Sequence, residues 1–211
     1  MEIIRGFNTK KKLEHWSSIC EEWLLINERF SRLTEGGGEA FACKERANIG
    51  LLAGAAWKCG RIALEEFHSI KLKDDEEKNG RVDLWICNDS GKEEWIEAKF
   101  NWLSLNSKNI IKICEDTLNN ACNDAIATKC GDKEVVSVGV AFLAFYIKNT
   151  DEENLINKIN NSIKIIKQEV KSDVIAWCFP EKAMNYCYED GRRNVGILLL
   201  ARKVKLNEDY L

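Results

Sequence analysis

The chain has 211 residues, of which 45% are hydrophobic and 31% are charged, and its formal net charge is −3. This length is typical of one domain, and the hydrophobic fraction is sufficient for a large core. The slightly acidic balance argues against a generally basic, histone-like nucleic-acid binder, although it leaves room for a local basic surface.

Motif content excludes several further classes. The two histidines, His15 and His68, are far apart in the sequence, which disfavours a zinc finger and a Ser-His-Asp hydrolase. The sequence contains neither the phosphate-binding motif G-x-x-x-x-G-K-[ST] nor the dinucleotide-binding motif G-x-G-x-x-G, so no nucleotide cofactor is indicated. The nine cysteines form no C-x-x-C pair and are odd in number, so free thiols in a reducing cytoplasm are expected. No segment resembles a signal peptide or a membrane span, which predicts a cytoplasmic protein.

The N-terminal part has the periodicity of two helices. Apolar residues recur at helical spacing over residues 10–33, which predicts an amphipathic helix that ends at Gly36–Gly38. Small and aliphatic residues over 39–57 predict a second helix packed closely on a sheet, with Gly60 as its end.

Strands are predicted next. Residues 62–73 favour a strand, and the acidic run 74–77 is then expected to turn through Asn79-Gly80 into an alternating apolar segment that carries Asp83. A second such segment, WIEAKF, follows a short loop that contains glycine.

The C-terminal half alternates helices and strands. Helices are predicted over 107–129 and 151–171, and the nearly all-apolar segment 134–147 has the composition of a strand buried on both faces. Two further strands are expected at 173–179 and 194–204. We therefore expect one domain over 1–211. Its parts are an N-terminal helical extension (1–38), a core with the order αβββαβ (39–147) and a C-terminal helix with strands (148–211).

The segments GRVDLWI and WIEAKF carry the strongest functional signal. Side chains alternate between the two faces of a strand, so if Cys87 pairs with Glu93 across the loop, then Asp83 lies opposite Glu97. Residues in such positions have Cβ atoms about 5 Å apart, and like charges there repel each other. A cation between the two carboxylates relieves the repulsion, and oxygen ligands suit Mg²⁺ or Mn²⁺.

Two alternatives remain open for this hairpin. It is an ordinary hairpin with one polar face if Glu97 and Lys99 are surface charges. A register slip of two residues would instead place Asp83 opposite Lys99 as a simple ion pair, which contributes little when exposed.

These residues resemble the signature of the PD-(D/E)XK nuclease superfamily. The motif here is Val82-Asp83 followed by Glu97-Ala98-Lys99, so the proline of the family's name is absent, although the Asp is the residue that the chemistry needs. The resemblance implies an α/β, restriction-endonuclease-like fold. Its central mixed sheet would have about five to six strands flanked by helices, and here it would carry an extra N-terminal helix.

The same resemblance implies an activity and its residues. Asp83, Glu97 and the carbonyl of Ala98 would hold Mg²⁺ or Mn²⁺, and Lys99 would orient the attacking water or bind the scissile phosphate. A helix before the three strands often adds an acid in this family, and Glu45 is the candidate by position; Glu65 or Glu66 are the alternatives.

The expected activity is that of a Mg²⁺-dependent endonuclease. It would hydrolyse phosphodiester bonds in DNA rather than RNA, in a defence, repair or mobile-element context, with a homodimer as the expected assembly and no membrane association. A catalytically inactive nucleic-acid-binding module on the same fold is one alternative. An acidic regulatory or interaction protein is the other.

Candidate substrate contacts are less specific. Lysines at 10–12, Arg192-Arg193, and Lys203 with Lys205 could meet phosphates, although charge runs are commonly solvated faces. Trp102 is either a buried aromatic or a stacking platform for a base. The pair Trp85 and Trp95 would either stabilise the hairpin or line the cleft.

Overall fold

The computed structural model describes residues 4–73, 76–129, 135–148 and 152–204. Lys205 and the acidic residues Asp74 and Asp75 lie outside them. The helices and strands run in this order: β1 (Ile4–Thr9), η1 (Lys11–Trp16), α1 (Ser17–Leu33), η2 (Ala40–Ala42), α2 (Lys44–Lys58), β2 (Ile62–Lys73), β3 (Glu76–Cys87), β4 (Glu93–Ser104), α3 (Ile110–Ala127), β5 (Thr128–Lys129), β6 (Val136–Lys148), α4 (Glu152–Glu169), β7 (Val174–Phe179), α5 (Glu181–Asn185) and β8 (Arg192–Lys203).

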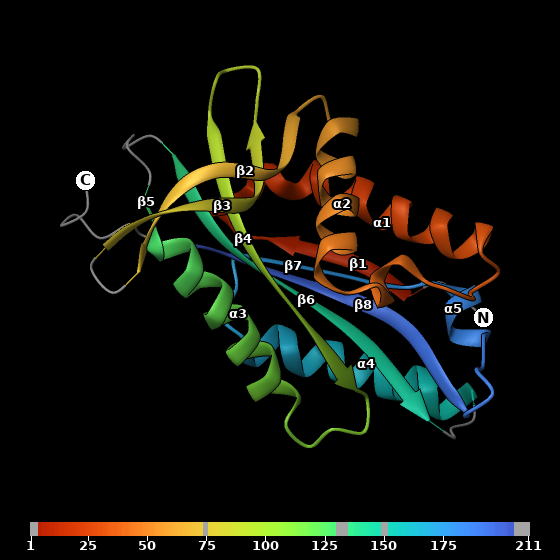
Figure 1. The fold of residues 1–211 in the computed structure, drawn as a ribbon. Coiled ribbons are helices and arrows are strands. Elements are labelled where there is room, and N and C mark those ends of the chain that lie inside the picture. The colour runs from red at the N-terminus through yellow and green to blue at the C-terminus, as the bar shows by residue number, and fades with distance from the viewer. Residues whose placement is uncertain (1–3, 74–75, 130–134, 149–151, 205–211) are drawn as a thin grey trace.

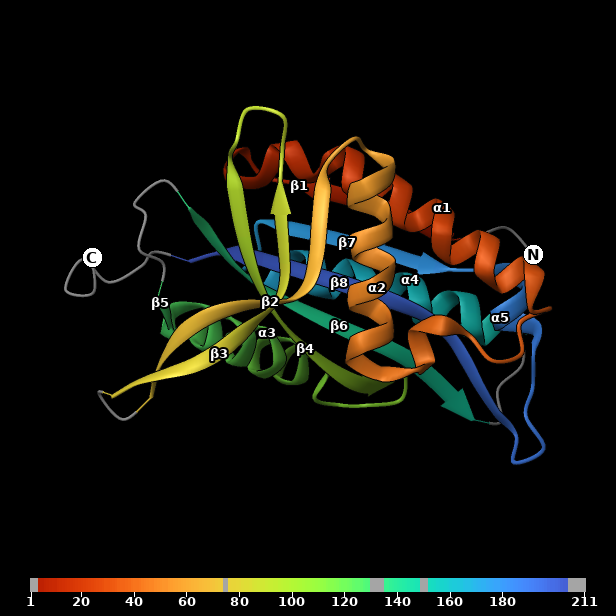
Figure 2. The same ribbon diagram turned by 45° about the horizontal axis from the view of Figure 1, so that its top comes forward.

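One mixed sheet organises the described residues. Its eight strands have the order β1-β7-β8-β6-β4-β3-β2-β5; β4 and β6 are parallel and the other neighbours are antiparallel. Helices α1 and α2 cover one face, and α3 and α4 cover the other (Figures 1 and 2). The predicted α/β class is confirmed, and the order αβββαβ is present over 39–147 apart from the short β5.

The sheet is larger than the five to six strands expected. Strand β1, with the sequence IRGFNT, pairs with β7, although its Gly and Asn weaken the alternating pattern. Strand β5 has only two residues and has no periodicity to detect. The first predicted helix is also divided, because Leu13 has non-helical φ and ψ angles and only the 3-10 helix η1 precedes α1.

Strand alternation divides the interior into two layers. In β6, Val140 and Phe142 pack into the core under α1 and α2, whereas Ala141, Leu143 and Phe145 face the core under α3 and α4. All five are fully buried, as the apolar composition of this segment predicted. A Cβ at Gly139 would lie 2.6 Å from the backbone nitrogen of Cys122, so glycine there allows α3 to approach β6 closely.

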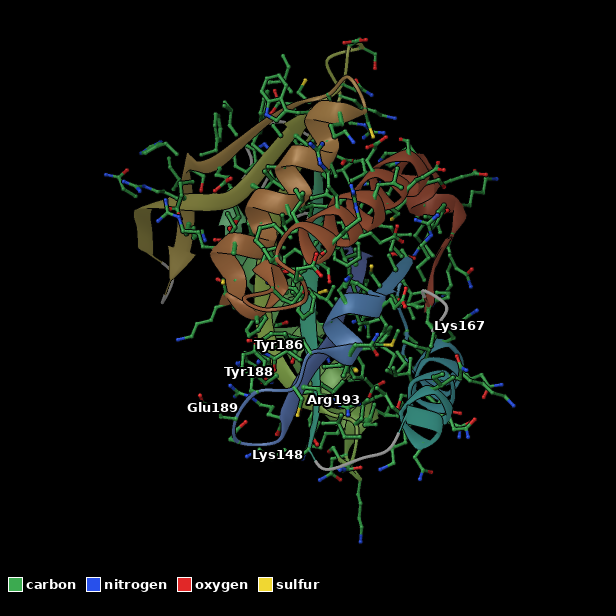
Figure 3. All side chains as sticks on the ribbon, turned by 90° about the vertical axis from the view of Figure 1, so that its right-hand side faces the viewer. Lys148, Lys167, Tyr186, Tyr188, Glu189 and Arg193 are labelled. Atoms are coloured by element: carbon green, nitrogen blue, oxygen red, sulfur yellow. The ribbon has the colours of Figure 1, made fainter. Side chains whose placement is uncertain are left out.

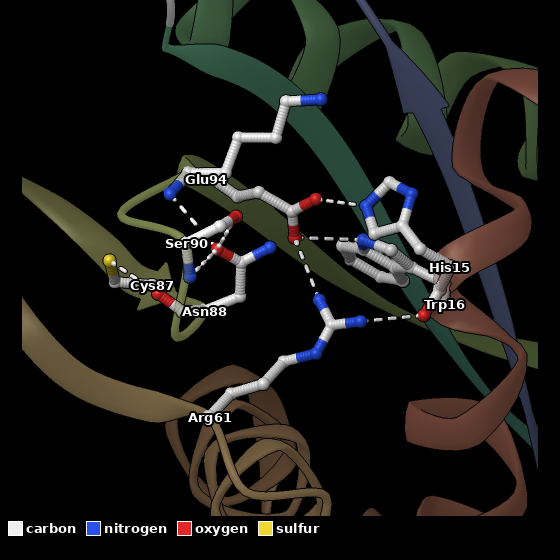
Figure 4. Close-up of polar contacts among 8 residues, drawn as sticks. His15, Trp16, Arg61, Cys87, Asn88, Ser90 and Glu94 are labelled. Atoms are coloured by element: carbon white, nitrogen blue, oxygen red, sulfur yellow. Dashed lines mark hydrogen bonds and ion pairs between the residues drawn. The ribbon is translucent and has the colours of Figure 1, made fainter.

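The register of the β3–β4 hairpin agrees with the sequence prediction. Cys87 pairs with Glu93 and Trp85 pairs with Trp95, which excludes the two-residue slip. In the loop, the side-chain oxygen of Asn88 accepts hydrogen bonds from the backbone N–H of Ser90 (Figure 4) and from that of Lys92, at 3.0 Å each.

The turn predicted at Asn79-Gly80 is wrong. Both residues lie inside β3, where Asn79 pairs with Ile70 and Gly80 pairs with Ser69. The pairing continues as far as Lys73 with Glu76, so the chain reverses before this dipeptide. Gly80 serves a close approach instead: a Cβ there would lie 2.8 Å from Cγ of Lys71.

The sequence also predicted free cysteine thiols and no membrane-spanning segment. All cysteines among the described residues are free thiols. No helix in the described part of the chain is both long and apolar enough to cross a membrane.

Candidate functional site

The motif residues meet where the backbone pairing of β3 and β4 ends. The last paired residues on this side are Leu84 and Ile96. Beyond them the side chain of Asp83 replaces the backbone of β3, because its Oδ2 accepts a hydrogen bond of 2.7 Å from the N–H of Ala98. Burial raises the pKa of Asp83, and the hydrogen bond from Ala98 and the charge of Lys99 oppose this rise.

Glu97 is the most buried acid of the group, with 2% of its surface exposed. Burial raises its pKa to about 6, and the nearby charge of Asp83 adds to the rise. Since Asp83 accepts the N–H of Ala98, which is next to Glu97 in the chain, the two acids lie at neighbouring positions of β3 and β4. The hydroxyl of Thr128, in β5 directly after α3, donates a hydrogen bond of 3.0 Å to Oε1 of Glu97.

Lys71, which no sequence motif points to, forms an ion pair with Glu97. Nζ of Lys71 is 2.8 Å from Oε1 and 2.9 Å from Oε2 of this carboxylate. Lys71 belongs to β2, and its stem crosses β3 at Gly80. The carboxylate thus already holds a cation, which is the ammonium group of the protein itself.

Lys99 lies among acids but is not the partner of Asp83 or Glu97 in a simple ion pair. Its ammonium pairs with the carboxylate of Asp124 on α3. Burial alone would lower the pKa of Lys99, but the hydrogen bond and the charge of Asp124 raise it, and the charges of Glu45 and Asp83 add to this effect. Lys99 therefore remains protonated.

Among the three candidate helix and strand acids, Glu45 contacts the motif strand. Burial raises the pKa of its carboxyl group, the charge of Lys99 and the nearby backbone N–H of Phe100 oppose this rise, and the charge of Asp83 adds to it. Glu66 is exposed and pairs with Arg81 at 3.5 Å, whereas Glu65 lies opposite Leu84. The structure thus brings Glu45 beside Asp83 and Lys99.

The donor set fits a hard divalent cation chemically. The described residues contain no group of three or more His, Cys, Asp or Glu side chains placed to hold a metal. Mg²⁺, however, commonly takes only one or two protein carboxylates and keeps several waters. The N–H and C=O of one strand residue point to the same edge of the strand. Because the N–H of Ala98 points to Asp83, its carbonyl lies on the same edge of β4, whereas a metal would have to displace the ammonium of Lys71 from the carboxylate of Glu97.

The predicted basic patches do not converge on these acids. Lys12 lies 3.9 Å from Asp173, whose other oxygen accepts the backbone N–H of Lys203. Arg192 is at the start of β8, whereas Lys203 is at its end, and the guanidinium of Arg192 lies over the ring of Tyr188. Figure 3 shows Arg193 beside the loop between α5 and β8 that carries Tyr188. Trp102 is half-buried and packs edge-on against Phe100 and Tyr146 at the margin of the core under α1 and α2, so it is neither a fully buried aromatic nor a free stacking platform.

Glu94 is a second buried acid, and its contacts hold parts of the fold together. Glu94 accepts hydrogen bonds from the ring of His15 and from Nε1 of Trp16, the latter at 2.9 Å, and its Oε2 is 3.9 Å from Arg61 (Figure 4). These contacts attach η1 to the β3–β4 hairpin.

A surface hollow of about 740 Å³ lies elsewhere, between α1 and α5, and none of the motif acids lines it.

Comparison with known proteins adds no relative. No family model matches the chain, and neither the curated proteins nor the solved structures contain a match.

Proposed function

We propose that this protein is a metal-dependent nuclease of the restriction-endonuclease-like fold, which hydrolyses phosphodiester bonds in DNA rather than RNA. One observation carries the proposal: the carboxylate of Asp83 reaches across to the N–H of Ala98, beside the buried carboxylate of Glu97. Lys99 and Glu45 border the same place from β4 and α2. The parallel pairing of β4 with β6, with α3 between them in sequence, agrees with that fold.

Each side chain has a role in such a reaction. Mg²⁺ or Mn²⁺ held by Asp83, Glu97 and the carbonyl of Ala98 would polarise both the attacking water and the phosphate. The ammonium of Lys99, kept charged by Asp124, binds a phosphate oxygen or orients the water. Glu45 adds negative charge near Lys99.

The ion pair of Lys71 with Glu97 supports a second candidate, an inactive nucleic-acid-binding module. In that case the ammonium permanently neutralises Glu97 and no metal is needed. Calorimetric titration separates the two candidates, because intact DNA binding without affinity for Mg²⁺ or Mn²⁺ would support the inactive module.

The direct test is a cleavage assay with single-stranded, duplex and branched DNA and with RNA, in Mg²⁺, in Mn²⁺ and in EDTA. We expect DNA cleavage that EDTA abolishes and that the variants Asp83→Asn, Glu97→Gln and Lys99→Met each lose. Asp116→Asn is the control, since Asp116 is an exposed acid on α3 away from the motif. Cleavage that survives the Asp83 and Lys99 substitutions would refute the assignment.

A further inference from the structure

Next to the acids, the sheet carries a surface of half-buried aromatic rings and exposed aliphatic side chains. Leu64 of β2, Trp85 of β3 and Trp95 of β4 are directly opposite one another, so they share one face of the sheet. The ring of Phe67 stacks on Trp85, with centroids 5.5 Å apart and planes 19° apart, and meets Trp95 edge-on at 6.0 Å. We call these four residues and Ile62 the aromatic face.

This face lacks the helical cover of the opposite one. Ala63, Leu84 and Ile86, which alternate with the aromatic-face residues, are buried in the core under α1 and α2. On the aromatic face, Leu64 is 46% exposed and Ile62 is 49% exposed. Helix α3 lies below β2 in Figure 1, whereas the loop of the β3–β4 hairpin projects above it. The rings of Phe67, Trp85 and Trp95 are half-buried, and with the two exposed aliphatic side chains they leave an apolar surface of the kind that marks an interaction site.

The aromatic face continues directly from the candidate catalytic site. Trp85 is two residues from Asp83 on β3, and Trp95 is two residues from Glu97 on β4. Each step of two residues keeps the side chain on the same face and moves it about 7 Å. A nucleic acid with its scissile phosphate at the two acids would therefore place a neighbouring nucleotide over the indole rings.

The indole N–H groups of Trp85 and Trp95 already have a hydrogen-bond acceptor within the protein. Nε1 of Trp85 and Nε1 of Trp95 both donate to Oε2 of Glu93, at 2.9 and 3.2 Å. The indoles can therefore offer a ligand only their apolar and π surfaces. Such surfaces stack on any base without reading its sequence, but only when the base is not already stacked within a duplex.

We propose that the aromatic face binds unpaired bases beside the scissile phosphodiester, so that single-stranded or locally opened DNA is the preferred substrate. This inference rests on the proposed nuclease function and names its substrate class. A second copy of the chain is the competing occupant of an exposed apolar face, and it is an outcome of the test below.

The test measures binding in EDTA, where no cleavage occurs, with a fluorescein-labelled DNA strand of about 15 nucleotides and with its blunt duplex. We expect the wild-type protein to bind the single strand more tightly than the duplex. Trp85→Ala should weaken single-strand binding about 5- to 100-fold, the range of one lost base-stacking contact, whereas Trp85→Phe should keep most of the affinity.

Leu64→Glu tests the same face without disturbing the core, because Leu64 is 46% exposed, and it should also weaken binding. Leu33→Glu, on a leucine that is 68% exposed at the end of α1, is the matched control and should bind as the wild type does.

Equal affinity for strand and duplex, or unchanged binding by both Trp85→Ala and Leu64→Glu, would overturn the inference. So would a sedimentation result in which Leu64→Glu turns a dimer into a monomer while single-strand affinity is unchanged. Because binding is measured without metal, failure of the nuclease proposal would show separately, as intact binding with no cleavage in Mg²⁺ or Mn²⁺.

Discussion

Lys71 and Glu97 form an ion pair in which one ammonium group lies 2.8 and 2.9 Å from the two oxygens of a buried carboxylate. The residues come from β2 and β4, and the lysine stem reaches Glu97 only because Gly80 of the intervening strand has no Cβ. The ammonium therefore stands near the place where a divalent cation would contact Glu97. A metal and this lysine compete for the same oxygens.

Replacing Lys71 by Met should therefore strengthen metal binding. Two unit charges about 4 Å apart interact by about 4 kcal/mol at an effective dielectric constant of 20, and a divalent ion roughly doubles this repulsion, part of which disappears in the variant. We expect the affinity for Mn²⁺ to rise at least about tenfold, as measured by isothermal titration calorimetry. Lys58→Met, which removes the exposed partner of Glu22, should leave the affinity unchanged.

Lys71→Met should also lower the stability of the protein, and a double variant can show that the loss comes from Glu97. Lys71→Met leaves the buried carboxylate of Glu97 without its cation, and such a loss typically costs about 3–5 kcal/mol. Lys71→Met combined with Glu97→Gln should recover much of the loss, because the buried charge is then also removed. If metal affinity were unchanged in Lys71→Met, the ammonium could not occupy the cation position.

Metal affinity should depend on pH through Glu97. Burial raises the pKa of this carboxyl group to about 6, so protons compete with the metal below that pH. We expect the affinity for Mn²⁺ to fall about tenfold per pH unit below about pH 6 and to be nearly constant above it. Calorimetric titrations between about pH 5 and 7.5 measure this profile, and a profile that is flat throughout would contradict the role of Glu97.

The hairpin could be predicted from sequence because its information is local. The alternation of Val82, Leu84 and Ile86 defines the buried face, and the short loop fixes the register that pairs Cys87 with Glu93. The proximity of Asp83 and Glu97 follows from that register. The fold class follows equally from alternating helices and strands, and these are patterns of period 3.6 and 2.

The partners of the motif residues could not be predicted in this way. Lys71 reaches Glu97 across an intervening strand, and Asp124 reaches Lys99 from the last turns of a helix, so both contacts depend on how distant elements pack. Asn79-Gly80 was misinterpreted as a turn because the dipeptide favours one locally, whereas the long β2–β3 pairing places this glycine under a side chain. Local preference was overridden by tertiary structure.

Glu39 should make the stability of the protein depend on pH. The residue is fully buried, and burial raises its pKa from 4.5 to about 7 although Ser31 opposes the rise. The folded state then binds a proton more tightly than the unfolded state, so the free energy of unfolding should decrease between about pH 4.5 and 7, by up to about 3 kcal/mol. Urea denaturation of Glu39→Gln should show a smaller decrease, and the part that remains is expected from Glu97, whose pKa is also raised. Glu21→Gln, on the exposed side of α1, should retain the full decrease.

Glu94 should contribute to stability rather than to catalysis. Its buried carboxylate joins η1 to the hairpin through His15 and Trp16, so Glu94→Ala leaves two donors without their acceptor and should destabilise the fold by about 2–4 kcal/mol. Trp16→Phe removes only the indole N–H and should cost about 1 kcal/mol beyond the change in packing. Urea titrations give both values. Cleavage per folded molecule should remain close to that of the wild type in Glu94→Ala, and a loss as complete as that of Asp83→Asn would place Glu94 in the reaction instead.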